Sequence, residues 1–252
     1  MSFWKSFLPA AGILCLEICC FSVAHAAGNT NTPITLPQIA QAFSQGQPVH
    51  SVVLSASAQW TAGSDSESGN ATLTASADGS FSVQLQLPKS SRTESQTSFA
   101  AGQSCTWSGN DGVVHVTPLH NCLSSVAWFL PSISLLGGQQ PSQITTTIGT
   151  ASATGLLDIQ QQRQPAANSS SFYSALLTQL GTTHLYLDAN TYLPTGLFFN
   201  MHPDDNSGAD IPMHVVFSDY QQVNGVMIPF RIQRYLNGTL NLDLTVTQAS
   251  VN

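Results

Sequence analysis

Charged side chains are scarce in this 252-residue sequence. It holds 6 Lys and Arg and 13 Asp and Glu, so 8% of its residues are charged and its formal net charge is −7. A typical soluble domain has about 25% charged residues. A basic nucleic-acid-binding protein is not expected, because neutralising phosphates takes clustered Lys and Arg. The hydrophobic content of 42% argues against a disordered chain.

Catalytic motifs are lacking as well. No GxSxG, HExxH, GxGxxG or P-loop string occurs, and after residue 26 the only glutamates are Glu67 and Glu94. These strings and paired carboxylates are what hydrolases, metalloproteases and nucleotide-binding enzymes use. We therefore expect no enzyme, no cofactor and no metal site. A hydrolase with an unrecognised triad is the weakest alternative.

Residues 1–26 have the pattern of a secretory signal peptide. A short segment with one lysine and no acid is followed by an apolar run over residues 8–23 and by Ala24-His25-Ala26, which places small residues where a signal peptidase reads them. A transmembrane anchor is the alternative, but the run contains Glu17 and a span needs about 20 residues. We expect an exported protein, periplasmic or extracellular, with no transmembrane segment once the signal is removed.

Two cysteines remain beyond that segment, Cys105 and Cys122. An even number in an exported chain predicts one disulfide, and two free buried thiols are the alternative. The pair has no zinc-finger spacing and no CxxC pattern.

Alternation of apolar and polar residues predicts antiparallel strands over 71–78 and 81–87. A three-residue loop at 78–80 would place Ala77 opposite Phe81 on one face. Further strands are expected at 52–60, 113–117, 144–150, 156–160, 185–187 and 196–201, and a surface loop at 160–171.

Three strands near the C-terminus share one apolar face. A two-residue turn at Asn224-Gly225 pairs Phe217 with Ile232, and a three-residue loop at 237–239 pairs Ile232 with Leu244. The opposite face is polar, which is typical of an antiparallel meander with one face in water.

An apolar sheet face needs a cover, and three segments are available. Residues 36–43 and 172–180 have apolar side chains at helical spacing. Residues 126–130, cut by Pro131, are expected to form a short helix or a covering loop. The chain therefore predicts a single, mainly β domain with a few helices (α+β) over residues 27–252.

The C-terminal third also carries an ordered set of motifs. Leu-Tyr-Leu-Asp at 185–188 is followed by Leu193-Pro194, then Phe-Ser-Asp-Tyr at 217–220, Val-Asn-Gly-Val at 223–226 and Ile228-Pro229. Over about residues 182–252 this order resembles the Lol-type (LolA/LolB-like) lipoprotein-carrier superfamily, most of all its uncharacterised exported bacterial members.

The resemblance implies a curved antiparallel sheet, a half-open barrel with helices packed on the concave face, and an apolar or lipid-like ligand bound or carried between sheet and helices. No lipoprotein-binding motif is matched residue by residue. The candidates for lining such a cavity are Trp128, Phe129, Phe172, Leu176, Val215, Phe217, Phe230, Ile232, Leu242 and Leu244. The alternative is a closed core, and then a structural or interaction domain that contacts an envelope protein partner.

Two polar clusters carry weaker hypotheses. Residues 202–205 (His-Pro-Asp-Asp) with Asp210 suggest a weak cation site or a lid, or, as we favour, a solvated acidic loop. His120-Asn121-Cys122 with Trp128 suggests a gate over a cavity or, as we favour, a plug that completes the core.

Arg234 is unusual because strand parity places it on the apolar face, opposite Val215. Near a strand end, a long cationic side chain can snorkel outward to water. An interaction with an anionic head group is the alternative.

Overall fold

The computed structural model describes residues 34–98, 104–124, 127–136, 144–149, 154–163, 170–203 and 205–252, so the expected signal peptide lies outside the described residues. Within these residues, thirteen strands form one sheet in which every paired neighbour is antiparallel. No helix among them is both long and apolar enough to span a bilayer.

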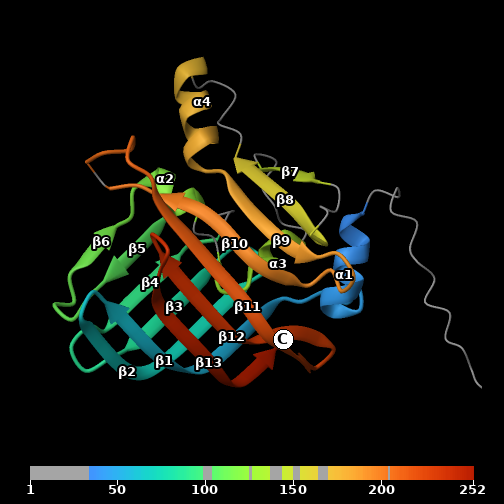
Figure 1. Ribbon diagram of the computed structural model, residues 1–252, viewed down its shortest axis with the longest axis horizontal. Helices are drawn as coiled ribbons and strands as arrows, with labels where there is room; N and C mark the ends of the chain where they lie inside the picture. The colour runs from blue at the N-terminus through green and yellow to red at the C-terminus, as the bar shows by residue number, and fades with distance from the viewer. Residues whose placement is uncertain are drawn as a thin grey trace, which may run out of the picture. The chain divides into compact units, whose positions relative to one another are not determined.

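The sheet consists of two meanders joined at their centre (Figure 1). The first contains β1 (Ser51–Ala62), β2 (Asp65–Ser76), β3 (Phe81–Gln86), β4 (Arg92–Gln96), β5 (Cys105–Ser108) and β6 (Val114–Val116). The second contains β7 (Ile144–Ile148), β8 (Leu156–Arg163), β9 (Thr183–Asp188), β10 (Pro194–Met201), β11 (Ile211–Val223), β12 (Val226–Leu236) and β13 (Thr239–Val251). The first and last strands pair with each other, which leaves β6 and β7 at the two edges.

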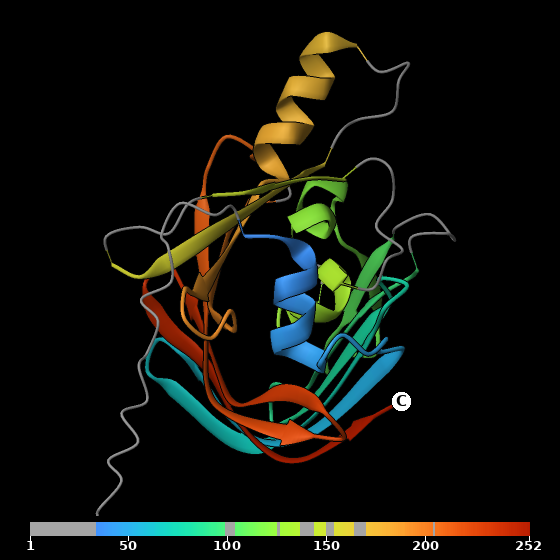
Figure 2. The same cartoon turned by 90° about the vertical axis from the view of Figure 1, so that its right-hand side faces the viewer.

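The sheet curls without closing, and short helices lie inside the curve (Figure 2). Helix α1 (Leu36–Ser44) contacts β12, and α3 (Pro131–Leu136) contacts β2 and β10. Helix α2 (Leu119–Ser124) lies against β10. The expected curved sheet, a half-open barrel with helices on its concave side, is therefore confirmed.

Helix α4 (Ser171–Leu180) forms where apolar spacing predicted it, but it does not cover the sheet. It contacts α2 and β8 and projects beyond the sheet in both views (Figures 1 and 2). Phe172 in its first turn is 79% exposed. The covering role predicted for this segment is wrong, since the helices that lie against the concave side are α1, α2 and α3.

The register of the C-terminal hairpins is mostly as predicted. Phe217 pairs with Ile232, and Ile232 with Leu244. The loop after β12 is shorter than expected: it is the two-residue turn Asn237-Gly238, whose positive φ angles of 47° and 77° suit a tight hairpin. A bulge after Arg234 absorbs the difference, which preserves the predicted pairing further along the strands.

The hairpin between β2 and β3 differs from its prediction by two residues. Ala75, rather than Ala77, lies opposite Phe81. The Asp78 carboxylate accepts hydrogen bonds from the backbone N–H and the hydroxyl of Ser80, at 2.9 and 2.6 Å, and thereby fixes a loop one position earlier. A shift of two residues keeps the same side chains on the apolar face, so the core is unaffected.

Pro131 was expected to cut an apolar segment, and it begins helix α3 instead. Proline is tolerated at the first position of a helix, because the N–H that it lacks has no partner within the helix there. The preceding Ala127 has a positive φ of 40°, and the Leu130 N–H bonds to its carbonyl at 2.8 Å. The turn places Trp128 and Phe129 at 2% and 0% exposure.

Candidate ligand cavity

A cavity of about 690 Å³ lies on the concave side of the sheet, between β3–β5 of the first meander and β10–β13 of the second. Small-molecule sites usually have volumes of about 300–1,000 Å³. Much of the wall is aromatic or thioether-bearing, and these side chains are Trp60, Phe81, Trp107, Trp128, Phe199, Met201 and Met213. The space is large enough for a small amphipathic molecule.

The cavity also contains an ion-pair cluster of Arg92, Glu94 and Arg234. Arg92 donates from Nε to Glu94 Oε1 at 2.7 Å, and Arg234 Nη1 lies 3.9 Å from the same oxygen. Arg234 also donates from Nη2 to Asn241 Oδ1 at 3.2 Å. One carboxylate therefore serves two guanidinium groups, that of Arg92 from its own strand β4 and that of Arg234 from β12.

Each arginine of this cluster is stacked on a tryptophan. The Arg92 guanidinium lies 4.4 Å from the centre of the Trp107 ring, and that of Arg234 lies 4.7 Å from the Trp128 ring. Cation–π contacts of this kind attract the cation to the ring face and are stronger where water is excluded. The rings therefore help to hold both guanidinium groups at the cavity wall.

Burial and charge act in opposite directions on the titration of the cluster. Burial raises the pKa of Glu94. The positive charges of Arg234 and Arg92 lower it by more than burial raises it, so the pKa lies below the ordinary 4.5. For the cation Arg234, burial acts the other way and lowers the pKa below its usual value, although the negative charge of Glu94 partly opposes this. Glu94 is therefore ionised at neutral pH, and Arg234 stays cationic because arginine does not lose its proton in proteins.

The outward direction expected for Arg234 is wrong. Its side chain is 14% exposed and lines the cavity, opposite Val215 in the pairing that parity predicted. The carboxylate of Glu94 and the ring of Trp128 supply inside the curve the favourable contacts that water would supply outside it.

The predicted lining residues separate into three groups. Trp128 lines this cavity. The remaining nine are not part of its wall. Six of these are core side chains at no more than 4% exposure: Phe129, Val215, Phe217, Ile232, Leu242 and Leu244. Phe230 packs partly buried against the core, Leu176 is half-buried on α4, and Phe172 is exposed.

Sequence reasoning missed the polar part of the cavity because it missed β4 and β5. Neither strand shows apolar alternation, yet β4 supplies Arg92 and Glu94 and β5 supplies Trp107. The scarcity of charge was a usable signal. In a chain with so few cations, the Arg-Thr-Glu run at 92–94 is a rare concentration of charge.

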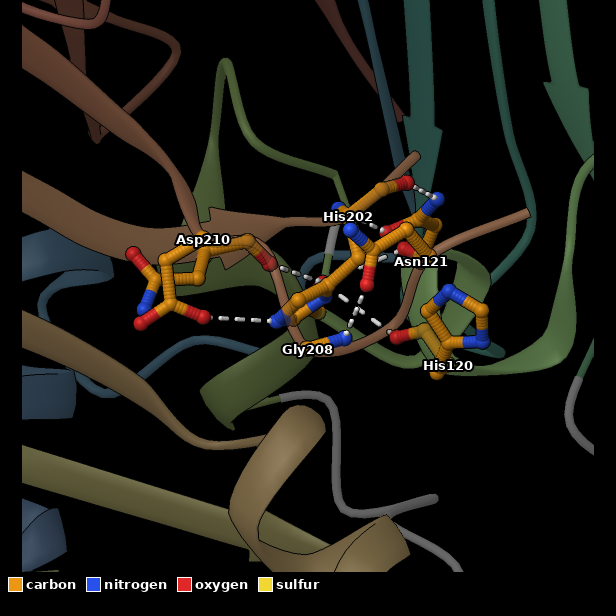
Figure 3. Close-up of polar contacts among 8 residues, drawn as sticks. His120, Asn121, His202, Gly208 and Asp210 are labelled. Atoms are coloured by element: carbon orange, nitrogen blue, oxygen red, sulfur yellow. Dashed lines mark hydrogen bonds and ion pairs between the residues drawn. The ribbon is translucent and has the colours of Figure 1, made fainter. Parts of the chain in front are cut away.

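The cavity is also lined by His202, one of the residues noted for its acidic neighbours, and Figure 3 shows its contacts. Its Nε2 lies 3.0 Å from Asp210 Oδ1, and its side chain is 1% exposed whereas that of Asp210 is 62% exposed. No group of three potential metal ligands occurs among the described residues. Asp204 lies outside those residues.

Asn121, from the other noted cluster, lies beside His202 and is bonded to it (Figure 3). Its Nδ2 donates to the His202 carbonyl and its Oδ1 accepts the His202 N–H, both at 2.8 Å. The adjacent Cys122 forms the predicted disulfide with Cys105, with an S–S distance of 2.00 Å. Phe129 packs edge-on against Phe81 at a centroid distance of 6.2 Å. This contact fits the favoured hypothesis that the segment completes the core.

Comparisons with known proteins bear on the fold. No protein-family model matches the sequence, and no curated protein matches it. Among solved structures, a "putative outer membrane lipoprotein-sorting protein domain" from Vibrio parahaemolyticus matches with a TM-score of 0.51 and 10% identity, over 89% of this chain and 94% of that one.

Two further solved structures match with a TM-score of 0.49 each. A DUF1329 family protein from Desulfovibrio piger is 8% identical over 86% of this chain and 91% of that chain. A LolA superfamily protein from Nitrosomonas europaea is 10% identical over 87% and 94%. The likeness to the lipoprotein-sorting domain from Vibrio parahaemolyticus is one of fold, and it is the fold that the C-terminal motifs predicted.

Proposed function

Starting from the fold shared with a lipoprotein-sorting domain, we propose that this protein binds or carries an apolar or lipid-like molecule in the cavity on the concave side of its sheet. The observation that carries the proposal is the cavity of about 690 Å³ with its aromatic and thioether wall. The proposed role is non-enzymatic.

Burial of a hydrocarbon chain supplies the driving force. Each methylene removed from water contributes about 0.8 kcal/mol, so a chain of about ten methylenes gains roughly 8 kcal/mol before the costs of association. Trp60, Phe81 and Trp128 offer the apolar surface for it. Polar side chains in the same wall, among them Arg92 and Arg234, could orient a head group.

The proposal places the protein outside the cytoplasm, in the bacterial envelope. The pattern of residues 1–26 is that of an export signal. The disulfide between Cys105 and Cys122 fits an oxidising compartment. A carrier of this kind would hand its ligand to an envelope partner, and the proposal includes such a partner protein.

The test is native mass spectrometry of the full chain purified from its host, before and after addition of the neutral amphiphile monolaurin. We expect one molecule bound per chain. Met201→Trp, which adds bulk at the cavity wall, should abolish binding, whereas Met227→Trp on the same sheet outside that wall should not. A clean unliganded mass under all conditions would overturn the proposal and favour an interaction domain with a closed core.

A further inference from the structure

Basic side chains gather in the cavity of a chain that is acidic as a whole. The formal net charge is −7. Among the described residues, Lys89, Arg92 and Arg234 all line the cavity, and the carboxylates in its wall are those of Glu94 and Asp111. The wall is therefore cationic by one charge, opposite in sign to the protein.

The contrast with Arg231 shows that this placement is not general for basic residues of β12. Arg231 lies on the outer face, where its side chain is 46% exposed and donates to Asp243 at 2.7 and 3.2 Å. Water and the Asp243 carboxylate, which also accepts from Gln233 Nε2, therefore satisfy its charge. Arg234, three residues further along the same strand, is 14% exposed and shares Glu94 with Arg92.

Arg234 has hydrogen-bonding capacity that the protein does not use. Its Nε is buried and has no hydrogen-bond partner among the described residues. Its two terminal nitrogens are directed to Asn241 Oδ1 and, at 3.9 Å, to Glu94. Buried donors are paired in the great majority of cases, so an unpaired one on a cation calls for an explanation. Since this Nε has almost no accessible surface, an acceptor on a bound molecule could pair with it only if the guanidinium shifts into the cavity that the side chain lines.

The geometry suits an anionic group. Guanidinium groups are weakly hydrated, stack on aromatic rings and present several donors in a plane that matches carboxylate or phosphate oxygens. The rings of Trp107 and Trp128 each pack against one face of a guanidinium group, that of Arg92 and that of Arg234 respectively. The same wall continues into the apolar side chains of Phe81 and Met213, which would contact a hydrocarbon chain.

We infer that the cavity takes a single-chain amphiphile with an anionic head group, a carboxylate or a phosphate, held by Arg92 and Arg234 while its chain lies against the aromatic wall. The inference rests on the proposed function, because it specifies the ligand of the same cavity. Glu94 plays a defined part: it neutralises the arginines in the empty protein and competes with the head group for them.

The experiment compares laurate with monolaurin, which share a twelve-carbon chain and differ in head-group charge. Affinities are measured by isothermal titration calorimetry at low salt on the full chain. Laurate should bind about tenfold more tightly than monolaurin, a difference of about 1.4 kcal/mol. Arg234→Gln should lose about this tenfold for laurate and leave monolaurin unchanged.

Glu94→Gln separates a binding role from a structural one, because it should tighten laurate binding several-fold by removing the competing charge. Arg231→Gln is the matched control and should change neither affinity. Arg92 is 40% exposed, so Arg92→Gln provides a second binding variant if Arg234→Gln fails to fold.

Equal affinity for laurate and monolaurin would overturn the inference and leave the proposed function standing. Weaker laurate binding by folded Glu94→Gln would also overturn it, because Glu94 would then not compete with the head group for the two arginines. Absence of binding by both amphiphiles would remove the proposed function as well.

Discussion

The side chain of Asn121 and the backbone of His202 exchange two hydrogen bonds of 2.8 Å, although 81 residues separate them in the sequence. The contact joins α2, which follows the first meander, to the segment after β10 of the second. Both residues line the cavity. The pair therefore ties the end of the first meander to the second within the cavity wall.

Asn121→Asp should destabilise the protein by about 1–3 kcal/mol, because the carboxylate has no donor for the His202 carbonyl and brings a charge into a buried site. Urea denaturation followed by circular dichroism measures the change. The exposed Asn70 provides the control, since Asn70→Asp should cost under about 0.5 kcal/mol. Equal effects of the two substitutions would show that the double hydrogen bond is not important for stability.

Removing the disulfide should lower the free energy of unfolding by about 3 kcal/mol, as expected from closing a loop of 17 residues in the chain-entropy model. The variant is Cys105→Ala together with Cys122→Ala, measured by urea denaturation. The wild-type chain in excess dithiothreitol should show a similar loss. A wild-type chain that is insensitive to the reductant would contradict the prediction.

Glu94 should contribute to acid sensitivity. Its pKa is lowered on folding, so its stabilising effect is complete above the unfolded value near 4.5 and is lost as the pH falls through the lower folded value. Glu94→Gln should be less stable than wild type by about 2–3 kcal/mol at pH 7, because Arg234 and Arg92 lose their carboxylate.

This difference should vanish in acid, where Glu94 of the wild type is protonated. Stability curves of both proteins from pH 7 to pH 2 provide the measurement. The exposed Asp65 at the start of β2 offers a control, since Asp65→Asn should leave the neutral-pH stability close to that of wild type. A gap between wild type and Glu94→Gln that stays constant with pH would rule out the ionised carboxylate as its cause.

Phe129 and Phe172 were equivalent candidates in the sequence, and the structure separates them. Phe129 is fully buried, so Phe129→Ala should cost about 3–5 kcal/mol through the cavity it leaves. Phe172 is 79% exposed on α4, so Phe172→Ala should change stability by less than about 0.5 kcal/mol. Thermal unfolding of the two variants tests the contrast directly, and similar melting temperatures would refute it.

Local patterns were sufficient for most of the sheet. Parity placed Phe217 against Ile232 and Ile232 against Leu244, because a one-residue slip would move a whole apolar set into water. The patterns failed where side-chain chemistry set the turn, as at Asp78, and where a strand has no apolar alternation, as in β4 and β5. Those two strands are fixed by backbone pairing with their neighbours, by the contact of Arg92 with Trp107 and by the Cys105–Cys122 disulfide, and none of these gives an alternating apolar pattern.

The sequence by itself determined a one-sided antiparallel sheet, the cysteine pair and the inward face of Arg234, because alternation and turn residues are local properties. Tertiary structure alone decided what Arg234 meets. Arg92 and Glu94 come from β4 and Arg234 from β12, and only the curl of the sheet brings them to one cavity. Curvature is a property of all the strands together, so no single segment of the sequence encodes it. Which of the few charged side chains contact one another is therefore decided by the tertiary structure.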